Sequence, residues 1–242
     1  MRDLIPAEVF SAIQEQYRSA RPITGDDFKE SREDEDTLSG AFGKGLREAV
    51  RGARDGYVWS THVTKTRGRG KGALEKRTGA DVVIEIEVRD ATGGVVGQKG
   101  LLGQAKTEWG PRDRRLVNQA ERMEEVAPNA SVVIDYRPDG TTACRSSSAI
   151  SAEGRRKDAK MKPLGDLLAD EFLTCEVGRR GMSYDDVRRQ MLVAAPEGIL
   201  RIPYVAELHV LTTVEPLGKK AVARLRRRLL DAEVVRATRP RR

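Results

Sequence analysis

Two neighbouring runs constrain the fold of this chain most strongly: DVVIEIEV at 81–88 and KGLLGQAKTE at 99–108. Both are rich in aliphatic residues and read as strands. The segment between them contains Gly93-Gly94, a pair that suits the turn of a β-hairpin. We therefore expect two consecutive antiparallel strands of one sheet.

The blocks around this hairpin predict an α/β fold. Helical spacing of apolar residues from Leu38 to Ala53 predicts a helix from near Glu35 to near Arg54, and GYVWSTHVTKT at 56–66 reads as a strand. The order becomes helix, three antiparallel strands, helix and two more strands, which gives a mixed central sheet flanked by helices. The other expected elements are helices at 7–19, 112–126, 163–176 and 183–194, strands at 131–138, 141–146 and 201–214, and a basic helix at 217–231.

Three regions follow from this layout. Residues 1–29 hold an N-terminal helix and a polar connector, and residues 30–175 form the α/β core. Residues 176–242 form a C-terminal extension with helical and basic character. The sequence does not decide whether this last third is a second lobe or an elaboration of the core.

Composition excludes several function classes. No apolar run is long enough to span a bilayer and the N-terminus lacks a signal-peptide pattern, so we expect a cytoplasmic protein with no membrane partner. Cys144 and Cys175 lie far apart, which disfavours a zinc site or a disulfide framework and predicts reduced, buried thiols. His62 and His209 are the only histidines, so any metal would depend on carboxylates.

Positive charge gathers at two places. The formal net charge is +7, and residues 219–242 alone hold ten Lys or Arg and two acids, so the rest of the chain is close to neutral. Residues 65–77, KTRGRGKGALEKR, form a glycine-rich basic stretch that reads as a loop contacting phosphates or as a solvated hairpin loop. The expected nucleic-acid contacts are Lys65, Arg67, Arg69, Lys71, Lys76, Arg77, Arg226, Arg227 and Arg228.

Polar residues share one face of the predicted hairpin. Asp81, Glu85 and Glu87 alternate with the apolar residues of their strand, and Gln104 and Lys106 share a face of the next strand. The helix that begins near Glu35 adds a further acid, since Glu35 lies on its apolar stripe and points toward the sheet. An N-terminal helix cap explains the acidic run around it but not an acid on the buried face.

These residues resemble the PD-(D/E)xK nuclease superfamily in its D…QxK variant. The resemblance covers about residues 30–145 and rests on an acid on the first helix, GAD opening a strand, and QAK on the next strand. It implies a restriction-endonuclease-like core in which Asp81, Gln104 and Glu35 bind Mg²⁺ or Mn²⁺ and Lys106 acts on the attacking water or the phosphate. Glu85 is a possible outer-shell acid. Gln104 departs from the acid that most members carry, so the metal would depend on Asp81 and Glu35.

The resemblance implies a divalent-metal-dependent endonuclease that hydrolyses DNA, plausibly in defence against foreign DNA or in repair. A homodimer or a partner subunit would fit such a role. The alternatives are a non-catalytic nucleic-acid-binding protein that retains a nuclease-like fold, and a basic scaffold protein within a larger complex. Cleavage that needs Mg²⁺ or Mn²⁺ and is lost in Lys106→Ala separates the first reading from the others.

Overall fold

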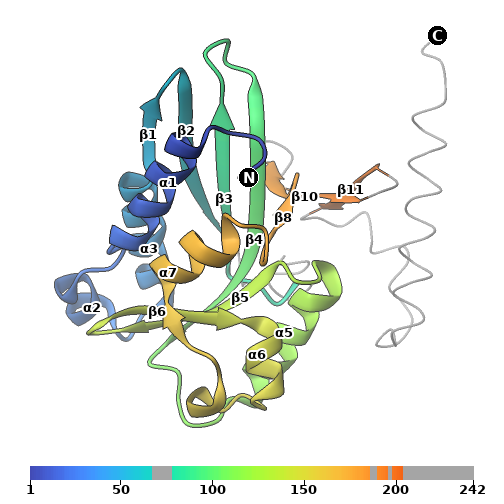
Figure 1. Cartoon of the computed structure of the whole chain (residues 1–242). Helices are drawn as coiled ribbons and strands as arrows, with labels where there is room; N and C mark the ends of the chain where they lie inside the picture. Colours follow the sequence, from blue (N-terminus) through green and yellow to red (C-terminus); the bar gives the residue numbers. More distant parts are fainter. Residues whose placement is uncertain (67–77, 186–189, 196–197, 204–242) are drawn as a thin grey trace.

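A mixed sheet with helices on both faces forms the centre of the computed structural model, which describes residues 1–66, 78–185, 190–195 and 198–203 (Figure 1). The predicted α/β class is confirmed. The strands follow one another across the sheet in the order β1 (Arg51–Arg54), β2 (Tyr57–Lys65), β3 (Val82–Arg89), β4 (Val95–Thr107), β5 (Ser131–Arg137), β6 (Gly140–Arg145) and β7 (Lys162–Pro163).

The long strand β4 joins the two halves of this sheet. β2, β3 and β4 are antiparallel, as expected, and β4 then runs parallel to β5. The β3–β4 turn uses Gly93 at φ +84, a conformation that glycine adopts without strain. Helix α5 (Arg114–Val126) makes the crossover that a parallel pair requires.

One face of the sheet packs against helices α1 (Ala7–Ser19) and α3 (Glu35–Ala49). Ile84 and Ile86 of β3 share a hydrophobic cluster with Ile13 of α1 and Phe42 of α3, and all four are buried. Helix α7 (Leu164–Leu167) and the π-helical turn Leu168–Phe172 complete this layer. The N-terminal helix therefore belongs to the same core as the sheet.

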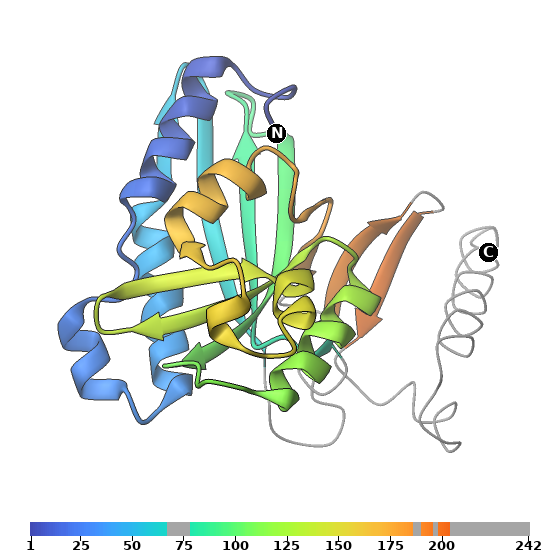
Figure 2. The same cartoon turned by 60° about the horizontal axis from the view of Figure 1, so that its bottom comes forward.

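Helices α5 and α6 (Ser146–Ser151) cover the opposite face, where Figure 2 shows them side by side. Asp113 begins α5 by accepting a hydrogen bond from the Leu116 backbone N–H at 2.9 Å, an N-cap contact. Leu116, Ala120 and Met123 are buried against this face. The chain thereby places one helical layer on each side of β3 and β4.

Two N-terminal predictions need correction. The segment expected to be a polar connector contains helix α2 (Gly25–Ser31), which begins with a capping box between Thr24 and Asp27. The helix expected to reach Arg54 ends at Ala49, because Arg51–Arg54 pair with β2 as strand β1. Gly52 lies against the Trp59 ring, and the edge pairing overrides the helical spacing of the apolar residues.

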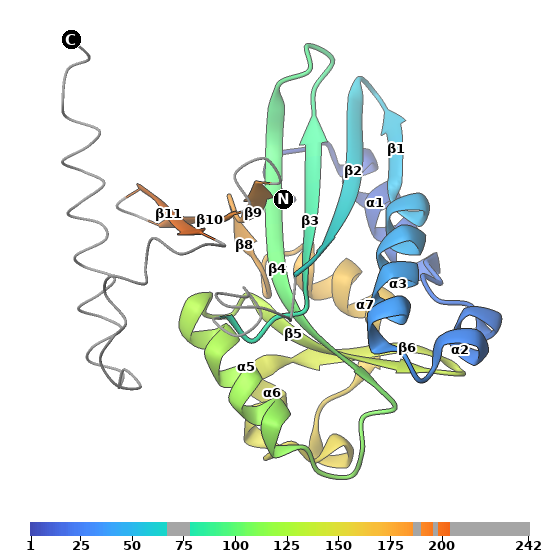
Figure 3. The ribbon, with the colours of Figure 1, turned by 180° about the vertical axis from the view of Figure 1, so that it is seen from behind.

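The C-terminal part of the described chain is more extended than expected. The helix predicted at 163–176 is present in α7 and the turn after it, whereas the helix predicted at 183–194 is wrong. β9 (Ser183–Asp185), β10 (Gln190–Ala195) and β11 (Gly198–Pro203) form a small antiparallel sheet, and β8 (Arg179–Arg180) pairs with β4 (Figure 3). The predicted basic helix at 217–231 lies outside the described residues.

No helix in the described ranges is both long and apolar enough to cross a bilayer. Both cysteines are free: Cys144 is buried, as expected, but Cys175 is exposed, which corrects the prediction of two buried thiols.

Candidate active site at the β3–β4 fork

β4 extends beyond its antiparallel partner, and the resulting fork holds Asp81, Gln104 and Lys106. β3 begins at Val82, opposite Gly103, whereas β4 continues to Thr107 beside β5 only. The Asp81 backbone N–H donates to the Gly103 carbonyl at 2.8 Å, which fixes the side of β4 that faces β3. Because odd residues of β4 share that side, the N–H groups of Ala105 and Thr107 open onto the fork instead of a neighbouring strand.

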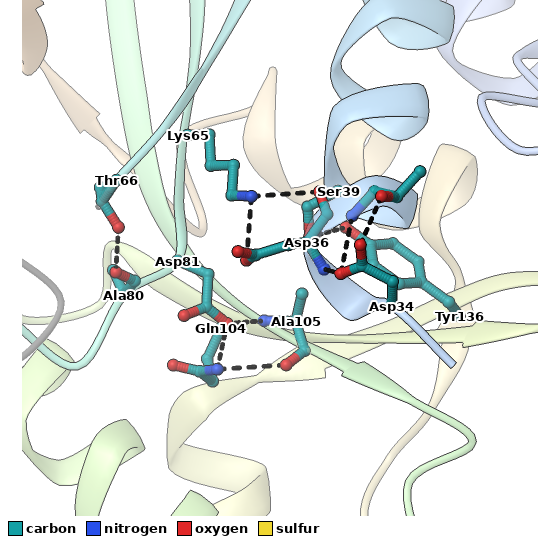
Figure 4. Close-up of polar contacts among 11 residues, drawn as sticks. Asp34, Asp36, Ser39, Lys65, Thr66, Ala80, Asp81, Gln104, Ala105 and Tyr136 are labelled. Carbon is teal, nitrogen blue, oxygen red and sulfur yellow. Dashed lines mark hydrogen bonds and ion pairs between the residues drawn. The ribbon is translucent and has the colours of Figure 1, made fainter. Parts of the chain in front are cut away.

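The structure brings Asp81 and Gln104 into direct contact at the fork (Figure 4). Oδ2 of Asp81 accepts hydrogen bonds from the Ala105 backbone N–H at 3.0 Å and from Nε2 of Gln104. Nε2 of Gln104 also donates to the Ala105 carbonyl at 3.1 Å. The two side chains predicted from the GAD and QAK motifs therefore form one hydrogen-bonded unit.

Glu35 contacts the same edge of β4 from the helical layer formed by α1 and α3. It is the first residue of α3, and its Oε2 accepts from the Thr107 backbone N–H at 3.2 Å. The cap of α3 is supplied by Asp34, which accepts from the N–H groups of Asp36 and Thr37. Glu35 is thus directed at the strand, and its anchor lies about 7 Å along β4 from the N–H that holds Asp81.

Tyr136 of β5 lies near both carboxylates. Burial raises the pKa of Tyr136, its hydrogen bond to Ser39 opposes the rise, and the negative charges of Asp81 and Glu35 increase it. The Tyr136 hydroxyl is fully buried and donates to Oγ of Ser39 at 3.3 Å. Both carboxylates therefore lie close enough to this side chain to act on its ionisation.

Two buried oxygen atoms beside the fork have no hydrogen-bond partner: Oε1 of Gln104 and Oγ1 of Thr107. Gln104 is only 1 % exposed, and its amide nitrogen is already committed to Asp81 and the Ala105 carbonyl. Buried polar atoms in folded proteins are nearly always paired, and an unpaired one calls for an explanation. A bound cation or a bound polar ligand would supply the missing partner for Gln104.

Lys106 lies two residues beyond Gln104, so the two side chains leave the same face of β4. The side chain is half-buried, and within the described ranges no hydrogen bond or ion pair engages it. Its cross-strand neighbour on β5 is Asp135. The fork therefore presents a lysine, on the same face of β4 as Gln104, whose ammonium group no described residue engages.

A buried charge cluster next to Lys106 was missed from the sequence. Asp135 is fully buried and accepts from the Trp109 backbone N–H at 2.7 Å, from Nε of Arg137 at 2.7 Å and from Nε of Arg156 at 2.6 Å. The only signal was a single acid inside the run SVVIDY. Nothing in that run indicates arginines two and twenty-one residues later as its partners.

The remaining predicted site residues lie elsewhere. Glu85 is buried four residues along β3, about 13 Å from Asp81, and accepts from the Tyr184 backbone N–H at 2.8 Å. Lys65 forms an ion pair with Asp36 at 2.9 Å, which ties the end of β2 to the start of α3. The other predicted nucleic-acid contacts, within 67–77 and 226–228, fall outside the described residues.

The donors at the fork suit a hard cation, although the charge they supply is small. Asp81, Glu35 and Gln104 offer carboxylate and amide oxygens, the ligand types of Mg²⁺ and Mn²⁺. Across the described ranges, no group of three or more His, Cys, Asp or Glu residues is arranged to hold a metal. Any cation at the fork would therefore use the Gln104 amide as well as two carboxylates.

Comparison with known proteins assigns no family to this geometry. The chain matches no family model, no curated protein and no solved structure. The candidate site therefore rests on the contacts between its own residues.

Proposed function

We propose that the chain is a divalent-metal-dependent nuclease that hydrolyses phosphodiester bonds of DNA at the β3–β4 fork. The observation that carries this proposal is the convergence of Asp81, Gln104 and Glu35 on the open edge of β4. Lys106 follows Gln104 by two residues and leaves the same face of that strand. The arrangement agrees with the residue roles implied by the resemblance to PD-(D/E)xK nucleases.

Asp81, Gln104 and Glu35 would hold the metal ion. Their oxygens fit Mg²⁺, and the unpartnered Oε1 of Gln104 supports the assignment because a cation would pair it. When bound, the ion supplies a more acidic water and neutralises charge that develops on the phosphate. Mn²⁺ accepts the same oxygen donors.

The protein's own residues fix the position of the phosphate. The Ala105 and Thr107 N–H groups orient the two carboxylates, so these groups are arranged before substrate binds. Lys106 supplies a positive charge at the next position on the strand, where it would stabilise the negative charge of the transition state. The cross-strand neighbour of Lys106, Asp135, already accepts from three donors.

A second candidate function is nucleic-acid binding without cleavage. The observation that favours it is the small negative charge at the fork, where Gln104 stands in place of an acid. A protein of this kind would bind DNA with strong salt dependence and leave it intact in every metal. Both functions thus predict DNA binding, and only the first predicts DNA cleavage.

The proposal includes a cytoplasmic location and DNA contacts from the basic stretch at 65–77 and from the last 24 residues. Neutralised phosphates add a counterion-release term, so deleting residues 219–242 should weaken DNA binding and flatten its salt dependence. An unchanged slope would assign those arginines to another partner. A homodimer or a partner subunit, in defence or repair, remains part of the proposal.

The proposed function is tested by incubating the purified protein with supercoiled, linear and single-stranded DNA and with RNA, in Mg²⁺, Mn²⁺, Ca²⁺ or EDTA. Cleavage of DNA in Mg²⁺ or Mn²⁺, absent in EDTA and in Asp81→Asn, is the expected result. Metal-independent cleavage, or equal cleavage by Asp81→Asn, would refute the assignment of the fork. Binding without cleavage in all metals would favour the second candidate.

A further inference from the structure

Two segments near the fork carry a dense positive charge. Residues 112–115 lie between β4 and the first turn of α5, and residues 153–160 follow α6. Together they hold seven Lys or Arg and three acids, so their formal charge is +4. We call these two segments the two-loop surface. None of the nucleic-acid contacts expected from the sequence lies on it.

The fold joins the two segments into one surface. The Asp113 backbone N–H donates to the Gly154 carbonyl at 3.0 Å. Glu153 pairs with Arg112 at 3.3 Å and with Arg155 at 2.8 Å. Glycine permits this close approach, because a Cβ on Gly154 would lie 2.3 Å from the Asp113 carbonyl oxygen. Cations from both segments are therefore held side by side.

The two-loop surface keeps an excess of positive charge because its acids are used inside the protein. The glutamate has two arginine partners, Asp113 is the N-cap of α5, and Asp158 pairs with Arg155 at 2.6 Å. Arg114 and Lys157 are exposed, and no acid in the described ranges pairs with either. These two side chains are available to an external anion.

The start of α5 carries cations where acids would be more stable. Arg114 and Arg115 are its first two residues, and its first turn contains no acid. The N-terminal end of a helix carries a partial positive charge, so cations there lower helix stability. Local rules of this kind are often broken at functional sites, and a bound anion would compensate for the cost.

The chemistry of the two-loop surface fits a nucleic-acid backbone better than another protein. Among the residues that the structure describes, the exposed large hydrophobic side chains are Leu4, Val58 and Val95, and none belongs to this surface. Protein interfaces depend on aromatic and aliphatic anchors. Backbone phosphates are instead contacted by Lys, Arg and other polar groups.

Hydrogen bonds connect the two-loop surface to the fork. Asp135, the cross-strand neighbour of Lys106, accepts from Nε of Arg156 at 2.6 Å and from the Trp109 backbone N–H at 2.7 Å. The ring N–H of Trp109 donates to the Gly154 carbonyl at 3.1 Å. The end of β4 and the two-loop surface are thus parts of one connected structure.

We propose that the two-loop surface binds the phosphate backbone of the DNA that occupies the fork. The inference rests on the proposed nuclease function, because it names the DNA-contact surface of the same site. Arg114 and Lys157 contact phosphates, whereas Arg155 and Arg156 are held by acids and support the surface. Each neutralised phosphate releases counterions, so this contribution to affinity depends on salt and not on base sequence.

The test compares the parent protein with Arg114→Gln/Lys157→Gln. The matched control is Lys44→Gln/Arg47→Gln, which removes the same charge from α3 in the other helical layer. Both control residues are exposed, and no acid in the described ranges pairs with them. Fluorescence anisotropy measures binding of the full chain to a labelled DNA duplex in EDTA, between about 50 and 200 mM salt. This readout does not depend on cleavage, and circular dichroism compares the folds.

We expect the slope of log affinity against log salt to fall by about 2 in Arg114→Gln/Lys157→Gln, since each lost phosphate contact removes about 1. The control variant should keep the parent slope. Equal slopes in the two variants would overturn the proposal, as would a parent protein that does not bind DNA. Cleavage with equal slopes would retain the nuclease proposal and remove this surface. Altered slopes without cleavage in any metal would retain the surface and refute the nuclease.

Melting of Arg114→Glu provides a second readout. Placing an acid at the start of α5 should raise the melting temperature of the DNA-free protein by about 1 to 3 °C and weaken DNA binding. A purely structural role for Arg114 predicts the opposite, namely a lower melting temperature with DNA affinity unchanged. That result would assign the arginine to the fold and overturn the proposal.

Discussion

Two lysines of β4, seven positions apart, meet opposite environments. Lys99 is fully buried, donates to the Phe172 carbonyl and lies 4.9 Å from the centroid of the Phe172 ring. Burial lowers its pKa to about 8, against the opposing charge of Cys175. Lys106 is half-buried, and no described residue pairs with it.

The difference follows from what surrounds each half of the strand. Around Lys99, β4 has β3 on one side and β8 on the other, and the π-helical turn Leu168–Phe172 covers its face. Around Lys106, β3 has already ended and only β5 remains. The ammonium group of Lys99 is therefore used in a contact within the protein, whereas that of Lys106 is available for a ligand.

The largest effect on cleavage is expected for a substitution at the fork, compared with one at the other end of the β3–β4 pair. Asp81→Asn keeps an acceptor for the Ala105 N–H but removes the negative charge, so cleavage should fall by about 10²-fold or more while the fold survives. Asp90→Asn is the control, since Asp90 also accepts backbone N–H groups but lies at the far end of β3. Equal rates for the two variants would remove Asp81 from the site.

Lys99→Ala should act on stability and not on chemistry. The substitution leaves a cavity beside Phe172 and removes the donor of its carbonyl, at a cost of about 3 kcal/mol in the free energy of unfolding. Urea titration measures this loss, and the cleavage rate per folded molecule should match the parent protein. Unchanged stability would mean that the lysine is not held as described.

The lowered pKa of Lys99 makes a further prediction about pH. In the unfolded chain this amine titrates near 10.5, whereas the folded value is about 8. Between these values the unfolded chain binds more protons, so the free energy of unfolding rises with pH, by up to about 3 kcal/mol. Lys99→Met should abolish that part of the rise. A parallel pH profile in both proteins would contradict the burial of a charged amine.

The smallest effect is expected for Gln104→Glu. The change adds a carboxylate, so cleavage should persist within about threefold and saturate at lower Mg²⁺. It also replaces the hydrogen bond to Asp81 by repulsion, so the melting temperature without metal should fall and recover when Mg²⁺ is added. Loss of cleavage with an intact fold would show that Asp81 needs the amide as a donor.

The sequence predicted the central strands well because their signals are local. Alternation and the Gly93-Gly94 turn specify the β3–β4 hairpin, and a period-2 face places Asp81 beside Gln104. The helical spacing of apolar residues continues past Ala49 and so predicted a longer helix than the structure has. Arg51–Arg54 instead form backbone hydrogen bonds with β2 as strand β1. The helix predicted at 183–194 was wrong for the same reason, because β9 and β10 form by pairing with each other.

The hydrogen-bond partners of the site residues could not be predicted from the sequence. Which backbone N–H groups hold Asp81 and Glu35 depends on where β3 ends relative to β4. The partners of Asp135 come from a different strand end and from a 3-10 turn, and no spacing rule joins them. Contacts of this kind depend on the assembled fold, so only the structure identifies them.

The most direct measurement is the single-turnover rate of plasmid cleavage in Mg²⁺ for Lys106→Met and Lys99→Met, with protein in excess over DNA and circular dichroism to confirm folding. The substitution is the same and the strand is the same, so only the environment differs. We expect Lys106→Met to lose about 10²-fold or more in rate and Lys99→Met to keep the parent rate per folded molecule. Equal rates in the two variants, or full activity in Lys106→Met, would contradict the assignment of the fork as the catalytic site.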